Sequence, residues 1–311
     1  MNENKTGNKR FIGPIFCITA AAIWGLSFVA QKTGAHIGTF TFNGIRTLIG
    51  GIFLLPFVPL FHKSAVKKYP AEKSRKFDFK GTASAGIICG IVLCVASNLQ
   101  QHAFTFDIFA AKVGFITALY MILVPLAGLF LGRKAGLNVW LAVVLGVIGL
   151  YFLCMKKGDF KVGTGEIFSI LCAIGFAAHI LVIDHFCVRA EPVALACTQF
   201  LTAGALSVIC MFIFEKPQIS EILDCAVPIL YTGIASTGIA FTLQIFGQKY
   251  TEPAVASLLM CLESVFSVIF GRIILHDIMG PRALLGCAIM FAGVVMSQIP
   301  FGNKKSTGET V

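Results

Sequence analysis

Ten long apolar segments, separated mostly by short polar links, dominate the chain. Each is about 20 residues long, which suits an α-helix crossing the hydrocarbon core of a bilayer and is too long for a barrel strand. Because most links are short, segments that follow each other in the chain are expected to lie side by side. The predicted membrane helices cover residues 11–31, 39–61, 81–104, 108–132, 138–155, 165–186, 192–214, 223–247, 253–275 and 281–301.

Composition agrees with lipid as the solvent. Hydrophobic residues make up 57% of the 311 residues and charged residues only 13%, whereas about 25% of an average soluble domain is charged. In lipid, backbone polar groups must be satisfied within the spanning segment, which favours helices. The first segment is too long for a signal peptide and ends without a cleavage site, so we expect it to be retained.

Basic residues predict the orientation. The longest link, His62–Lys80, carries seven Lys and Arg residues and is expected in the cytoplasm of a bacterium. Alternation from there puts both termini inside, with sixteen Lys and Arg on the inner side, eight on the outer side and Arg46 within the second segment. The net charge of +10 is therefore a topology signal. No nucleic-acid partner is expected, because no soluble segment could host a binding domain.

Eleven cysteines are present, and most lie inside apolar segments. They form no CxxC or CxxH cluster, so neither a metal site nor a disulfide framework is expected. Their predicted role is that of small apolar packing residues. We expect no metal and no cofactor.

The second half of the chain repeats the first at an offset of about 143 to 153 residues. Leu119 then aligns with Leu262, and Trp24 with Phe176. Each half has five predicted helices, an odd number, so the second half enters the membrane from the opposite side. We therefore predict an all-α integral membrane protein with ten transmembrane helices arranged as two inverted five-helix repeats, an architecture of many secondary transporters.

This repeat divides the chain into five parts. A cytoplasmic tail (1–10) precedes the first repeat (11–155), a linker (156–164) leads to the second repeat (165–301), and a second cytoplasmic tail (302–311) follows. Two glycine pairs, Gly86/Gly90 and Gly128/Gly132, have the GxxxG spacing that permits close helix contacts.

Several stretches resemble a known family. They are Ala22–Lys32 (AIWGLSFVAQK), Phe40–Arg46 (FTFNGIR), Ala111–Thr117 (AKVGFIT), Tyr231–Gly233 and Leu262–Glu263. Together they resemble the drug/metabolite transporter superfamily, specifically its ten-helix branch with two EamA-type domains, over about residues 11–300. The resemblance implies a transporter, and an exporter in particular. This chain has Ser264 where the family often has proline after the Leu-Glu pair, and Arg133 where many members have an acid.

Two charged residues lie within the predicted helices, where a charge at the bilayer centre costs about 2.5–3.5 kcal/mol on insertion scales. Arg46, in the outer third of the second helix, is a candidate ligand for a substrate carboxylate or phosphate; the alternatives are a structural pair or snorkelling. Glu263, near the middle of the ninth helix, is a candidate proton carrier or a ligand for a cationic substrate. The alternative is a carboxyl that holds helices together.

Other polar and aromatic residues are expected to line the same pocket. Trp24, Ser27 and Gln31 share one helical stripe, and Asn43 lies one turn from Arg46. Trp24 and His179 could equally be packing residues. The full set of substrate-binding candidates is Trp24, Ser27, Gln31, Asn43, Arg46, Gln100, Tyr120, His179, Gln199 and Gln244.

The leading hypothesis is a secondary transporter that exports a small metabolite, an amino acid or a related compound, by alternating access. An intramembrane enzyme would need a catalytic constellation, but HExxH, GxSxG and paired aspartates are absent from the sequence. A membrane receptor or scaffold would need larger soluble parts.

No phosphate-binding glycine loop is present, so energy is expected from a gradient of a proton or a counter-substrate. The chain is expected to act as a monomer or homodimer.

Overall fold

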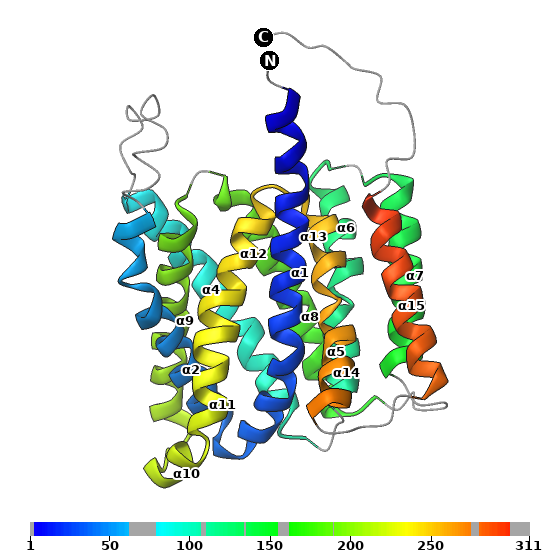
Figure 1. The fold of residues 1–311 in the computed structure, drawn as a ribbon. Helices are drawn as coiled ribbons and strands as arrows, with labels where there is room; N and C mark the ends of the chain where they lie inside the picture. The colour runs from blue at the N-terminus through cyan, green and yellow to red at the C-terminus, as the bar shows by residue number, and fades with distance from the viewer. Residues whose placement is uncertain are drawn as a thin grey trace.

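The computed structural model describes residues 3–61, 79–106, 110–133, 135–154, 162–188, 190–274 and 280–298. Regular structure in these ranges is entirely helical (Figure 1). The first half contains α1 (Glu3–Thr33), the 3-10 helix η1 (Gly34–Ile37), α2 (Thr39–Leu54), α4 (Phe79–Ala103), α5 (Ala110–Ala118), α6 (Tyr120–Phe130) and α7 (Leu137–Cys154). The second half contains α8 (Thr164–Cys187), α9 (Pro192–Phe214), α10 (Ile219–Asp224), α11 (Ala226–Leu230), the π-helix η3 (Tyr231–Ala240), α12 (Phe241–Gln248), α13 (Pro253–Met260), α14 (Glu263–Ile274) and α15 (Pro281–Gln298).

Seven helical segments in the described ranges are long and apolar enough to cross a bilayer, and three apolar helices are shorter. The seven are Ile12–Ile37, Thr39–Phe61, Lys80–Ala103, Val113–Phe130, Thr164–Cys187, Pro192–Phe214 and Ala226–Gln248; the shorter ones are Leu137–Leu153, Pro253–Ser267 and Pro281–Ser297. Large apolar side chains such as Phe130 and Phe212 face outward, as a lipid-facing surface requires. The chain is therefore a multi-pass membrane protein.

Helix α1 begins at Glu3, so helical residues precede the predicted first span and enter the predicted tail 1–10. The tail 302–311, most of the basic stretch His62–Lys80 and most of the linker 156–164 lie outside the described residues.

The two predicted glycine contacts have different outcomes. Gly86 and Gly90 of α4 pack closely against α9, where a Cβ atom on Gly86 would lie 2.5 Å from Thr198 Cβ, so this prediction is confirmed. The prediction for Gly128 and Gly132 is wrong. Gly132 has φ +75° and no atom within 4 Å of a built Cβ, and Arg133 N donates to the Gly128 carbonyl at 2.9 Å. Gly132 ends helix α6, and the Gly128 carbonyl accepts the hydrogen bond that closes its last turn.

Three apolar helical segments are interrupted near their middles. The α5–α6 segment breaks at Leu119, whose N–H donates to the Ile116 carbonyl at 3.2 Å in a tight turn. The α13–α14 segment breaks at Cys261–Leu262, and the α11–α12 segment widens into η3. The breaks at Leu119 and at Cys261–Leu262 contain no proline or glycine. The two breaks occupy positions that the predicted repeat aligns, Leu119 with Leu262.

Packing between the halves follows a paired pattern. Helix α1 packs on α13, α14, α12 and η3, while α8 packs on α5, α6 and α4. Helix α2 packs on α9, and α7 packs on α15 at one edge of the bundle (Figure 1). Helix α1 begins and α15 ends at the same end of the bundle (Figure 1). The interrupted segments meet at the centre, where the candidate site lies.

Candidate functional site

A cavity in the middle of the bundle is lined by residues from both halves. Its volume of about 50 Å³, counted as space open to the centre of a water molecule, has room for a few waters. Eight of the eleven predicted site residues line it. The complete lining is Trp24, Ser27, Phe28, Gln31, Arg46, Gln100, Thr117, Tyr120, Phe176, Ile180, Ser236, Phe241, Gln244, Met260 and Glu263.

Arg46 brings a buried cation to this cavity. Its side chain is only 4% exposed, and its Nε donates to Asn43 Oδ1 at 2.6 Å. The guanidinium carbon lies 5.7 Å from the centroid of the Phe42 ring, a favourable cation–π distance. Within the described residues, no carboxylate is ion-paired with Arg46. Because a buried charge is costly unless it is paired, this guanidinium is suited to an anionic ligand.

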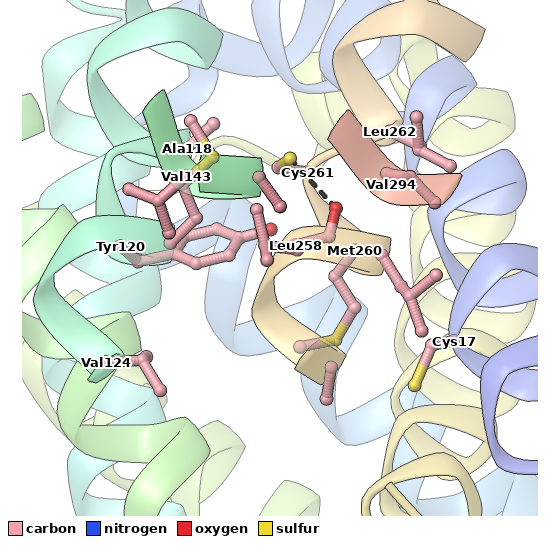
Figure 2. Close-up of a cluster of buried hydrophobic side chains, with 14 of the residues drawn as sticks. Cys17, Ala118, Tyr120, Val124, Val143, Leu258, Met260, Cys261, Leu262 and Val294 are labelled. Atoms are coloured by element: carbon pink, nitrogen blue, oxygen red, sulfur yellow. Dashed lines mark hydrogen bonds between the residues drawn. The ribbon is translucent and has the colours of Figure 1, made fainter. Parts of the chain in front are cut away.

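The two broken helices contribute a carboxyl group, on Glu263, and a phenolic hydroxyl, on Tyr120, to the same cavity. Tyr120 is the first residue of α6 and Glu263 the first residue of α14. The Tyr120 hydroxyl lies 3.5 Å from Glu263 Oε1, the long limit of a hydrogen bond. Figure 2 shows the Tyr120 ring reaching from α6 toward the α13 segment that carries Leu258 and Met260. The two residues that the repeat aligns therefore meet across the cavity.

The α1 stripe contacts the π-helical segment η3. Trp24 Nε1 donates to the Ser236 carbonyl at 3.2 Å, and Ser27 Oγ donates to Ser236 Oγ at 3.0 Å. Gln31 Nε2 donates to Ser27 Oγ at 3.4 Å. The Trp24 ring packs edge-on against Phe241, with ring centroids 4.7 Å apart. Trp24 is thus held by contacts and still presents part of its surface to the cavity.

Two amide oxygens on the cavity lining lack partners. Gln31 Oε1 and Gln244 Oε1 are buried and make no hydrogen bond within the described part of the chain. The amide nitrogen of Gln244 donates to Gln248 Oε1 at 2.9 Å. Buried polar atoms without partners are rare in folded proteins. Both oxygens line the same cavity as Arg46 and Glu263, where they could accept a hydrogen bond from a ligand or from water.

Three predicted site residues lie away from the cavity lining. Asn43 lies behind Arg46. His179 Nε2 and Gln199 Oε1 lie 3.2 Å apart, forming a contact between α8 and α9. The remaining ring nitrogen, His179 Nδ1, and the amide nitrogen of Gln199 have no partner among the described residues.

Two stretches of the chain, residues 11–155 and 163–298, match the EamA-like transporter family. The chain belongs to this family. The match covers most of the chain and confirms the resemblance found in the sequence.

Relatives of this EamA-like chain have similar length. An uncharacterized transporter of Archaeoglobus fulgidus is 27% identical over 297 residues, which cover 93% of this chain and 87% of the relative. The uncharacterized transporter YoaV of Bacillus subtilis is 22% identical over 297 residues, with coverage of 93% and 97%. One solved crystal structure shares the fold with a TM-score of 0.72 at 19% identity, covering 92% of this chain and 96% of that one. The family and its relatives make this protein a membrane transporter.

The EamA-like site contains residues that sequence reasoning missed. Phe28 lies one turn from Trp24 and beside Ser27 on the same stripe, so helical spacing could have found it. Ser236 and Thr117 are small polar residues, which are common in membrane helices and carry little signal alone. The remaining missed residues are apolar: Phe176, Ile180, Phe241 and Met260.

The metal-ligating residue types are dispersed in the described part of this EamA-like chain. No group of three His, Cys, Asp or Glu residues that could hold a metal ion occurs there. The ten cysteines whose side chains are described are free thiols, and eight of them are buried. Their placement agrees with a packing role.

Proposed function

We propose that this protein is a secondary transporter that exports a small metabolite, an amino acid or a related compound, by alternating access through the central cavity. The observation that carries the proposal is the presence of Arg46 and Glu263 on one cavity without an ion pair between them or to any other described residue. A ligand with a carboxylate and an ammonium group would offer a partner to each of these two side chains. The unpartnered oxygens of Gln31 and Gln244 add acceptors for such a ligand.

Alternating access requires halves that can rock around the site. The paired packing pattern supports this, because nearly every contact of α1 with the second half has its counterpart for α8 with the first. The breaks at Leu119 and Leu262 support it further, since discontinuous helices often form transporter sites near the bilayer midplane. We propose that the three shorter apolar helices also cross the membrane, giving ten spans in two inverted repeats.

The orientation and the energy source are part of the same proposal. The basic residues of 62–80 favour the cytoplasmic membrane with both termini inside. Glu263 is the candidate for proton coupling, because a carboxyl on a buried cavity can exchange a proton or bind an ammonium group. Export is favoured by the family resemblance.

Flux into proteoliposomes tests the proposal. The twenty proteinogenic L-amino acids are offered one at a time, in radiolabelled form, to vesicles with and without the protein. Saturable, protein-dependent uptake and counterflow of at least one of them is expected, with loss of at least about tenfold in Arg46→Gln, since one charge-assisted hydrogen bond is worth about 1.5–3 kcal/mol. Absence of flux for all twenty would remove the amino-acid assignment.

A further inference from the structure

Arg46 is held by a buried polar network on the side away from the cavity. Its Nε donates to Asn43 Oδ1 at 2.6 Å. The amide nitrogen of Asn43 donates to the Ser97 carbonyl at 2.8 Å and to Asn98 Oδ1 at 3.1 Å. Neither Asn43 nor Asn98 lines the cavity. Asn43 and Asn98 can therefore affect the cavity only indirectly, through the hydrogen bond that Asn43 accepts from Arg46.

The network continues into the second half of the chain. Asn98 Nδ2 donates to Ser207 Oγ of α9 at 2.8 Å and to the Cys94 carbonyl at 2.8 Å. Asn43 on α2, Asn98 on α4 and Ser207 on α9 are all buried. None of their side-chain polar atoms lacks a partner, in contrast to the cavity amides Gln31 and Gln244. A fully satisfied buried network is rigid, so this one can fix the guanidinium in place.

We propose that Asn43 and Asn98, anchored on Ser207, are positioning residues that orient Arg46 for an anionic group of the substrate. With Nε bonded to Asn43, the two Nη nitrogens remain as the fork that can hold a carboxylate in bidentate fashion. Because Asn43 is neutral, it holds the guanidinium without cancelling its charge. The proposal rests on the proposed function, in which this cavity binds the substrate.

Two substitutions at position 43 change the charge and the network differently. Asn43→Asp keeps an oxygen acceptor beside Nε but loses the two donations to Ser97 and Asn98, and the new carboxylate neutralises Arg46 and competes with the substrate anion. In Asn43→Leu the charge stays and the orientation is lost. We expect Asn43→Asp to lose saturable uptake and Asn43→Leu to keep it with a higher KM.

Uptake kinetics in proteoliposomes test the network at Asn98. The probes are the L-amino acid with the largest saturable uptake and its carboxamide, which lacks the carboxylate. Asn98→Leu is expected to raise KM for the acid about tenfold, with the maximal rate changed less than about twofold, and to leave the amide unaffected. Thr82→Val, which removes a buried hydroxyl from the same helix away from the cavity, should match the wild type. A purely structural role predicts equal losses for acid and amide, and that result would overturn the proposal.

A measurement without substrate keeps the proposal testable if no amino acid is transported. In protein with ¹⁵N at arginine Nε, the Arg46 signal is assigned by its absence in Arg46→Gln. Its Nε–H is expected to exchange slowly with solvent in the wild type and at least about tenfold faster in Asn43→Leu, with Ser207→Ala in between as the milder variant. Equal exchange in all three proteins would contradict the network even if transport were intact.

Discussion

At the residue scale, the cavity presents an arginine and a glutamate that do not form an ion pair with each other. Arg46 enters from α2 and Glu263 from the start of α14, and both are more than nine-tenths buried. A buried charge without a partner costs free energy in the absence of a ligand. Unpaired buried charges are therefore typical of binding sites and are rare among purely structural residues.

Arg46→Lys tests what the guanidinium contributes beyond its charge. Lysine keeps the positive charge but has no Nε for Asn43 and no planar fork for a carboxylate. We expect uptake of the best amino-acid probe to fall at least about fivefold in Arg46→Lys and further in Arg46→Gln. Thermal stability of the purified proteins serves as the folding control, and equal uptake in Arg46→Lys and wild type would contradict a bidentate role.

Glu263→Gln tests proton coupling. Glutamine has nearly the same shape as glutamate but cannot exchange a proton. Uptake measured from pH 5.5 to pH 8.5 is expected to lose its pH dependence in this variant, whereas Tyr120→Phe should retain it. A pH profile of Glu263→Gln that parallels that of the wild type would assign the coupling elsewhere.

Sequence reasoning found the charged and amide residues of the site because such residues are rare in apolar segments. It placed Arg46 and Glu263 among the candidates on this ground alone. It did not find Asn98 or Ser207, because small polar residues often bond to their own helix and the sequence does not say which face they occupy. It could not separate His179 and Gln199, which bond to each other, from residues that line the cavity.

At the element scale, the start of α2 depends on the end of α9. Gly38 has φ +102° and supplies no capping side chain. The Glu215 carboxylate instead accepts from Phe40 N at 2.9 Å, Thr41 N at 2.8 Å and Thr41 Oγ1 at 2.7 Å. In the second half, Glu191 caps its own helix through Val193 N and Ala194 N.

Removal of this cap should destabilise the protein. In Glu215→Ala two backbone N–H groups of α2 lose their acceptor, at a cost of about 1–2 kcal/mol. We expect a clearly lower melting temperature in detergent than for the wild type. Asp224→Ala, which removes an exposed acid nearby in the chain, is the matched control; an equal effect of the two substitutions would show that the cap contributes nothing.

The helix ends and breaks differ in how far they could be predicted. Apolar length located the seven long apolar segments that the structure contains, since lipid imposes a minimum length on each membrane-crossing helix. The breaks at Leu119 and at Cys261–Leu262 contain no proline or glycine, so helix propensity did not predict them. The helices on either side of these breaks pack on each other, α6 against α13, a contact that only the three-dimensional structure reveals.

At the scale of the whole molecule, the proposed topology has both ends of the chain on the cytoplasmic side. Helix α1 begins and α15 ends at one end of the bundle (Figure 1). A fluorescent protein fused to either terminus is therefore expected to fluoresce, whereas alkaline phosphatase at the same places should stay inactive. An active phosphatase at one terminus only would mean an odd number of spans and would rule out two inverted five-helix halves.

In the proposed mechanism, one cavity between the two halves opens to each side of the membrane in turn. Its most direct test is the labelling of Gln100→Cys, a cavity-lining position, with a membrane-impermeant thiol reagent applied from either face of oriented vesicles. Gln199→Cys, buried but away from the lining, is the control. We expect labelling of Gln100→Cys from both faces and slower labelling in the presence of the transported amino acid. Labelling from a single face, unaffected by any amino acid, would contradict it.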